Sequence, residues 1–152
     1  MPTNASKLLF ICTGNTCRSQ MAHALAHQWA ESHLLKLDIK SRGTAANHGD
    51  ATTIDALLVM QAVGINWQGS SQLLSLADLK WADYVWVMTQ EQLVFTRGLA
   101  EPLPQDCLPP IELIAPQVEL LDPLNLGFTA YQDLWQSLTS LLPWRLAALQ
   151  RP

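Results

Sequence analysis

The chain has 152 residues, of which 49% are apolar and 14% are charged, and its formal net charge is −4. This length fits a single domain over residues 1–152, and the composition favours a packed core over disorder. The scattered Lys and Arg residues form no basic stripe, so we expect no nucleic acid partner. No apolar run reaches the ~20 residues of a membrane span, and the polar start of the chain lacks the pattern of a signal peptide.

The chain contains three cysteines, Cys12, Cys17 and Cys107. An odd and small number of cysteines is a poor disulfide framework for a secreted domain. Reduced thiols in a cytoplasmic protein are the simplest interpretation, and such thiols are available for chemistry.

The first 35 residues predict a strand, a tight loop and a helix. Lys7–Ile11 is a short apolar run, which is typical of a strand covered on both faces. A polar turn with a glycine follows it. From Ser19, a candidate N-cap, the apolar residues follow helical spacing, and one helix face contains Met21, Ala22, Leu25, Ala26, Trp29 and Ala30.

The middle of the chain predicts two more strands with a helix between them. Leu37–Ser41 is the second short strand. Asp50 is a candidate cap for a helix over Ala51–Val63, which Gly64 is expected to end. The pattern that best fits an interior strand is Tyr84–Met88.

The last part of the chain predicts two helices separated by a proline-rich loop. One helix begins at about Gln90. The prolines within 102–116 predict a loop, which a strand at Ile111–Ile114 interrupts. Phe128–Leu149 has helical spacing, and we expect Pro143 to kink or break that helix.

Strands that alternate with helices predict an α/β fold: a doubly wound, four-stranded parallel sheet with helices on both faces, in a single domain. In such sheets, ligands bind beyond the carboxyl ends of the strands. The loop that begins at Cys12 leaves the first strand at that edge. We therefore expect the functional site there.

This loop combines a nucleophile, a cation and a helix start within eight residues. A short loop that enters a helix points its backbone N–H groups inward and forms an anion cradle. Arg18 adds a forked cation that suits a phosphoryl group, and the same positive field stabilises a Cys12 thiolate. Ser19 can donate a hydrogen bond to that thiolate, and Asn15 tolerates a left-handed backbone. The candidate anion-binding residues are Thr13, Gly14, Asn15, Thr16, Cys17, Arg18 and Ser19.

Two other interpretations of these residues stay open. Cysteines at strand ends are often inert and buried, although such a cysteine does not require a glycine turn and an arginine at a helix start. Cys12, Cys17, His23 and His27 also have a spacing that resembles a zinc site superficially. The spacing is too short for a zinc finger and Arg18 would lie inside it, so we expect no metal and interpret the histidines as solvent-facing.

A phosphoester reaction also needs a proton for the leaving oxygen. Asp122 is the best candidate acid, because it lies in a connector before the last helix and Pro123 restricts it to an extended conformation. The alternative is that Asp-Pro is ordinary turn chemistry.

Together these segments resemble the low-molecular-weight protein tyrosine phosphatase family over nearly the whole chain. The matching residues are Phe10 to Ser19, Met21-Ala22, Ser41 with Gly43-Thr44, Ala82-Asp83, Asp122-Pro123 and Tyr131. The resemblance implies a cytoplasmic signalling phosphatase that acts on a phosphorylated protein, uses no metal or other cofactor, and is a monomer or weak dimer. It implies that Cys12 attacks phosphorus, that Arg18 holds the phosphoryl oxygens, and that Asp122 is the general acid. It also implies that Cys17 can form a protective, reversible disulfide with the nucleophile.

The chain departs from the family pattern at positions near the expected substrate. Gln20 replaces the usual Pro, Leu124 replaces an aromatic residue after Asp-Pro, and His23 stands where Glu is common. Gln68-Gly69-Ser70-Ser71 lacks both the His and the Arg of the family segment.

These departures leave several functions open besides that of a protein tyrosine phosphatase. Thr13, Thr16 and the Ser70-Ser71 pair resemble protein arginine phosphatases, and Thr13 would narrow the pocket to suit a planar guanidinium. The loop with Gln20 also resembles thioredoxin-coupled arsenate reductases, but these need a relay pair of cysteines after the third strand, and Thr89–Leu99 contains none, so that only Cys107 remains. An inactive phosphoprotein-binding module is the last alternative.

Overall fold

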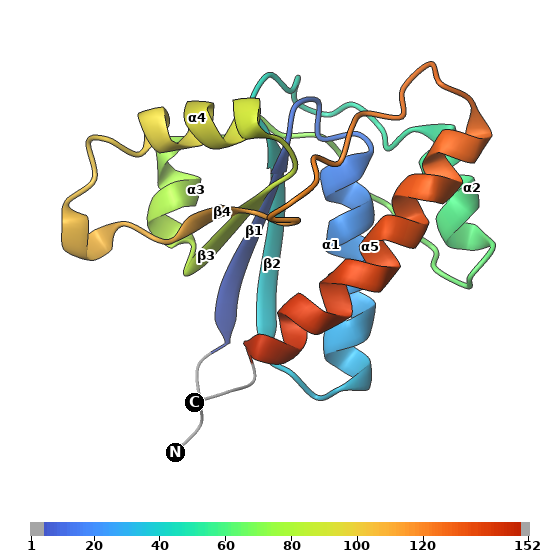
Figure 1. The fold of residues 1–152 in the computed structure, drawn as a ribbon, viewed down its shortest axis with the longest axis horizontal. Coiled ribbons are helices and arrows are strands. Elements are labelled where there is room, and N and C mark those ends of the chain that lie inside the picture. The colour runs from blue at the N-terminus through green and yellow to red at the C-terminus, as the bar shows by residue number, and fades with distance from the viewer. Residues whose placement is uncertain (1–4, 150–152) are drawn as a thin grey trace.

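A computed structural model describes residues 5–149 as one α/β domain (Figure 1). Its sheet has four parallel strands in the order β2-β1-β3-β4. The strands are β1 Ser6–Cys12, β2 Leu37–Gly43, β3 Tyr84–Val87 and β4 Ile111–Leu113. The change of direction in strand order beside β1 is the feature that defines a doubly wound sheet. The predicted fold class and strand number are confirmed.

Helices cover both faces of the sheet (Figure 1). On one side of the sheet lie α1 Arg18–Ser32 and α5 Phe128–Ala148, with α2 Ile54–Gln61 packed against α5, and on the other side lie α3 Leu76–Trp81 and α4 Gln90–Leu99. The central strand β1 serves both cores, since alternate side chains of a strand point to opposite faces. Leu8 and Phe10 belong to the first cluster, and Leu9 and Ile11 to the second, all with 0% exposure.

Several predicted boundaries shift for identifiable reasons. The helix expected at 51–63 begins only at Ile54, after Thr53, because Ala51 instead forms an antiparallel bridge with Ser70. The expected cap at Asp50 is therefore wrong. Gly64 does follow this helix, with a φ of +84° that suits glycine.

Pro143 lies inside α5, which continues to Ala148, so the expected break is absent. A proline in a helix interior costs about 3 kcal/mol. On both sides of it, however, Leu138, Leu142 and Leu146 are fully buried, and burying a leucine contributes about 1.5–3 kcal/mol. Packing thus outweighs the lost hydrogen bond.

The short helix α3 was not predicted. Its signal is a capping box, in which the Ser75 hydroxyl accepts from the Asp78 amide and the Asp78 carboxylate accepts from the Ser75 amide. Within residues 5–149, no helix has the length and hydropathy to cross a membrane.

Candidate active site

The loop that begins at Cys12 connects the carboxyl end of β1 to the first turn of α1. Its backbone is tied to neighbouring segments: Cys12 O accepts from Thr44 N at 2.9 Å, and Thr16 O accepts from Thr53 N at 2.9 Å. Asn15 has a φ of 56°, which confirms the predicted left-handed conformation. These contacts hold the loop at the edge of the sheet where the sequence predicts a ligand.

The two glycines nearest the loop differ in what they accommodate. A Cβ on Gly43 would lie 2.4 Å from Thr13 O, so the protein itself requires glycine there. A Cβ on Gly14 would meet only Thr16 Oγ1, at an ordinary 3.7 Å. Close packing within the protein therefore explains Gly43 and does not explain Gly14.

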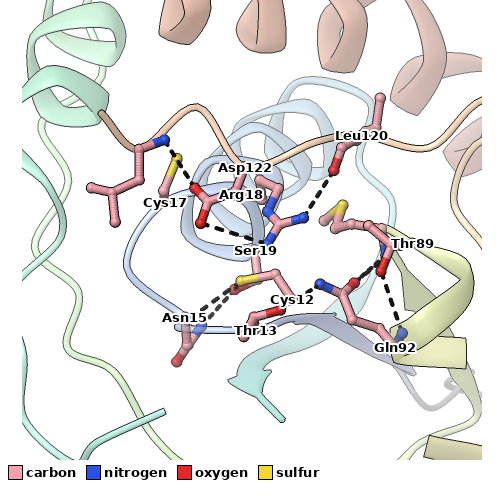
Figure 2. Close-up of polar contacts among 12 residues, drawn as sticks. Cys12, Thr13, Asn15, Cys17, Arg18, Ser19, Thr89, Gln92, Leu120 and Asp122 are labelled. Atoms are coloured by element: carbon pink, nitrogen blue, oxygen red, sulfur yellow. Dashed lines mark hydrogen bonds and ion pairs between the residues drawn. The ribbon is translucent and has the colours of Figure 1, made fainter. Parts of the chain in front are cut away.

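Hydrogen-bond donors surround the Cys12 thiol, which is 2% exposed. Its Sγ lies 2.9 Å from Ser19 Oγ and accepts from the Asn15 backbone N–H at 3.3 Å (Figure 2). The expected contact between Ser19 and the sulfur is confirmed. Ser19 is not the N-cap, however: it is the second residue of α1, after Arg18, and the cap position belongs to Cys17.

The direction of these hydrogen bonds follows from Asn15, which is fully buried. Its Oδ1 accepts from the Gln72 backbone N–H at 2.9 Å, so its Nδ2 faces Ser19 and donates to Ser19 Oγ at 2.6 Å. The Ser19 hydroxyl hydrogen is then free, and it is donated to Cys12 Sγ when the sulfur is a thiolate. A chain of donors thus ends at the sulfur, which is the arrangement that stabilises a thiolate.

Arg18 and Asp122 meet beside this loop although they are distant in sequence. Arg18 is 4% exposed and donates through Nη1 to Leu120 O at 3.0 Å. Its Nη2 lies 4.0 Å from Asp122 Oδ2, and the Asp122 side chain is 48% exposed. Asp122 Oδ1 accepts from the Leu124 backbone N–H at 3.1 Å, which orients the carboxylate. Figure 2 shows the two side chains next to each other, close to Ser19 and Cys12.

Cys17 has surroundings different from those of Cys12. Its thiol is buried, and its Sγ lies 4.0 Å from Met21 Sδ. Burial raises the pKa of Cys17 well above its usual range, and the nearby Cys12 and Asp122 raise it further. Cys17 is therefore a neutral thiol at neutral pH. Cys12, Cys17 and Cys107 are all free of disulfides.

Gln20 connects the loop that begins at Cys12 to residues 67–70. In the sequence, Gln20 and residues 68–71 are two separate departures from the family pattern. Its Nε2 donates to Asn15 O at 3.0 Å and to Ser70 O at 3.3 Å, and its Oε1 accepts from Trp67 Nε1 at 2.8 Å. A Cβ on Gly69 would lie 2.1 Å from Gln20 Oε1. Gln20, Trp67 and Gly69 are thus adapted to one another and support the loop from outside.

Sequence reasoning did not identify Trp67, Gln72 or Gln92 as parts of the site. Gln72 and Gln92 contact the loop residues Asn15 and Thr13, 57 and 79 positions away, and Trp67 contacts Gln20, 47 positions away. Their local patterns carry no signal, apart from the capping box Thr89-x-x-Gln92 at the start of α4.

The histidines divide between the core and the surface. His27 is exposed as expected, but His23 is partly buried, with Nδ1 3.3 Å from Ser41 Oγ and its ring against Trp67. Burial, with smaller contributions from His27 and Arg42, lowers the pKa of His23 to about 4. The expectation of two solvent-facing histidines is wrong for His23. In the described part of the chain, no three His, Cys, Asp or Glu side chains are grouped as a metal site would require.

The chain matches a protein family and individual relatives over most of its length. Residues 7–151 match the family described as low molecular weight phosphotyrosine protein phosphatase. One relative, the low molecular weight protein-tyrosine-phosphatase PtpB of Staphylococcus epidermidis, is 28% identical over 138 residues, which are 90% of this chain and 94% of that protein. A protein-arginine-phosphatase of Geobacillus stearothermophilus is 37% identical over 83 residues, but the match spans only 54% of its length.

Solved structures give the same result. The YwlE arginine phosphatase from Geobacillus stearothermophilus superimposes with a TM-score of 0.84 at 27% identity, covering 95% of this chain and 93% of that one. A low molecular weight protein tyrosine phosphatase from T. tengcongensis has a TM-score of 0.84 at 25% identity, covering 97% and 100%. The chain belongs to the low molecular weight phosphotyrosine protein phosphatase family. The family and the class of enzyme, a cysteine-dependent protein phosphatase, are thus as the sequence predicts.

Proposed function

We propose that this chain hydrolyses phosphotyrosine in phosphorylated proteins through a phosphocysteine intermediate on Cys12. The observation that carries the proposal is the thiol itself: Cys12 Sγ lies 2.9 Å from the Ser19 hydroxyl and 3.3 Å from the Asn15 amide, at the start of α1. Donors that stabilise a thiolate beside a helix N-terminus and Arg18 suit attack on a phosphate dianion.

In the first step, the Cys12 thiolate attacks phosphorus and the bond from phosphorus to the leaving oxygen breaks. Arg18 and the backbone amides of the loop hold the three equatorial oxygens. Gly14 supports this role. Packing within the protein would allow a Cβ at this position, so the absence of a side chain leaves room for an oxyanion instead. Asp122 gives its proton to the leaving oxygen.

In the second step, water attacks the phosphocysteine and its proton passes to Asp122, so that Cys12 leaves as a thiolate and inorganic phosphate forms. The half-exposed Asp122 side chain is reachable by both water and substrate. Its approach to Arg18 brings the acid to the site before substrate binds.

The phosphate-binding residues that we propose are those expected from the sequence: Thr13, Gly14, Asn15, Thr16, Cys17, Arg18 and Ser19. Cys17 would also act as a protective thiol. When an oxidant converts Cys12 to a sulfenic acid, the Cys17 sulfur attacks it, water leaves and a disulfide forms, which a thiol can later reduce. Since burial keeps Cys17 protonated, this reaction would be slower than attack by an exposed thiolate.

Phosphoarginine is the second candidate substrate. Thr13 is exposed beside Cys12, where its branched side chain would narrow the pocket to suit a planar guanidinium, and Leu124 offers no ring to stack on a phosphotyrosine. The arsenate reductase alternative has less support, because Cys107 lies in a short 3-10 turn, Gln105–Cys107, before β4. That is the amino edge of the sheet, opposite the end of β1 where Cys12 lies.

A panel of substrates tests the proposal with the purified, reduced chain. We expect turnover of an aryl phosphate and of phosphotyrosine peptides, and loss of all turnover in Cys12→Ser. Preference for a phosphoarginine peptide would select the second candidate. Full activity of Cys12→Ser would show that the mechanism is wrong, and a wild-type chain that binds but hydrolyses no phosphorylated residue would favour the binding module.

The remaining expectations are proposals as well. We propose that the partner is a phosphorylated protein, that the location is cytoplasmic and that the chain is a monomer or weak dimer. The three free thiols support a reducing compartment.

A further inference from the structure

Gln92 connects the start of α4 to the residue next to the nucleophile. It is the third residue of that helix and 2% exposed. Its Oε1 accepts from the Met88 backbone N–H at 2.9 Å and from the Thr89 backbone N–H at 3.1 Å. Its Nε2 donates to Thr13 Oγ1 at 3.1 Å. Figure 2 shows Gln92 reaching from α4 toward Thr13, beside Cys12.

The orientation of this amide is determined by chemistry. The two backbone groups that face one end of the Gln92 side chain are N–H donors, so that end must be the oxygen. The nitrogen therefore faces Thr13 and donates to it. The Thr13 hydroxyl is thus an acceptor toward the protein, and its own hydrogen and its second lone pair remain available.

That hydrogen is accessible to a substrate that reaches Cys12. Thr13 follows the nucleophile directly and is exposed, whereas its contact with Gln92 lies on the buried side. The phosphoryl oxygens are common to both candidate substrates, but a hydroxyl that keeps its hydrogen can also donate to the bridging oxygen of an aryl phosphate. A protonated guanidinium presents only N–H donors, so it gains nothing from a donor at this place.

We propose that Gln92 is a specificity-determining positioning residue, which acts through Thr13 by keeping the Thr13 hydroxyl hydrogen available to substrate. This inference rests on the proposed function, because it concerns the choice between phosphotyrosine and phosphoarginine at the same site. Gln92 does not touch the reacting atoms. It determines whether the Thr13 hydroxyl acts as a hydrogen-bond donor or only as an acceptor toward the leaving group.

Glutamate at position 92 separates this role from helix capping. A Glu at the third helical position caps as well as Gln, because both accept from the N-cap backbone N–H, and a negative charge near a helix N-terminus is favourable. A carboxylate has no hydrogen to donate, however. In Gln92→Glu the Thr13 hydroxyl must donate to the carboxylate, and only its lone pairs then face the substrate.

The experiment compares kcat/KM for a phosphotyrosine peptide and a phosphoarginine peptide of the same sequence. We expect Gln92→Glu to shift the ratio toward phosphoarginine by about fivefold or more, the effect of about one hydrogen bond, with the melting temperature unchanged. The matched control is Gln90→Glu, which makes the same charge change at an exposed position in the same helix turn. We expect the control to leave the ratio within about twofold of wild type, since a surface charge acts weakly.

A double variant distinguishes an effect through Thr13 from a direct effect of charge. In a Thr13→Val background there is no hydroxyl to reorient, so Gln92→Glu is expected to shift the ratio by less than about twofold. An unchanged ratio in the single variant would overturn the proposal. So would a shift of the same size in the Thr13→Val background. If wild type hydrolyses neither peptide, it is the proposed function that fails, and this outcome is seen before any variant is made.

Discussion

Ser19 connects the nucleophile to the loop that holds it, so Ser19→Ala is a sharp test of the thiol's surroundings. The side chain is fully buried, and its hydroxyl lies 2.9 Å from Cys12 Sγ and 2.6 Å from Asn15 Nδ2. Alanine removes the hydroxyl and leaves the Asn15 amide without this acceptor. An unpaired buried donor costs about 1–3 kcal/mol, so we expect the free energy of unfolding to fall by about that amount.

The effect on turnover is separate, because the hydroxyl also donates to the sulfur that carries charge during the reaction. A hydrogen bond to a charged group contributes about 1.5–3 kcal/mol, which corresponds to a factor of about 10 to 150 in rate. We expect kcat/KM for an aryl phosphate to fall by that factor in Ser19→Ala. Urea denaturation and steady-state kinetics at neutral pH measure the two effects independently.

Ser32→Ala is the matched control, since it makes the same chemical change at the exposed last residue of the same helix. We expect both of its measurements to stay close to wild type. Turnover of Ser19→Ala equal to that of wild type would refute the argument that Ser19 directs its hydrogen at Cys12. A loss of stability without a loss of rate would restrict Ser19 to a structural role.

Two further predictions concern a carboxylate and a histidine. Asp122→Ala should slow turnover by about 10²- to 10⁴-fold for poor leaving groups and less for good ones. The free energy of unfolding should change by less than about 1 kcal/mol, because the ion pair with Arg18 is long and half-exposed. Equal slowing for all leaving groups in a kinetic series would contradict a role of Asp122 as the acid. His23 has its pKa lowered to about 4 in the folded chain, against 6.5 for an ordinary histidine. The unfolded state therefore binds the proton first, and stability should fall by up to about 3 kcal/mol as the pH drops from about 6.5 through 4. Urea denaturation at several pH values checks this, and a His23→Gln variant with the same loss over that range would assign the effect to other groups.

The sequence alone determined the parts of this protein that depend on local patterns. The apolar run of β1, the loop from Cys12 to Arg18 and the helical spacing after it are contiguous, so periodicity and turn chemistry identify them together. The left-handed Asn15 follows from its own side chain. The contact between Ser19 and the sulfur follows from the short loop that separates them.

Tertiary structure decided what joins distant segments. Arg18 binds Leu120 O across 102 positions, and Gln92 binds Thr13 across 79. No local pattern encodes such a pair, since each side chain finds its partner only after β1 and β3 align and α4 packs on the sheet. Tertiary packing also explains Pro143. Local sequence patterns predict that a proline breaks a helix, but Pro143 lies within α5 because the neighbouring leucines are buried. Thus the nucleophile was evident from its own segment, whereas the groups that orient it and select its substrate depend on the packing of the whole domain.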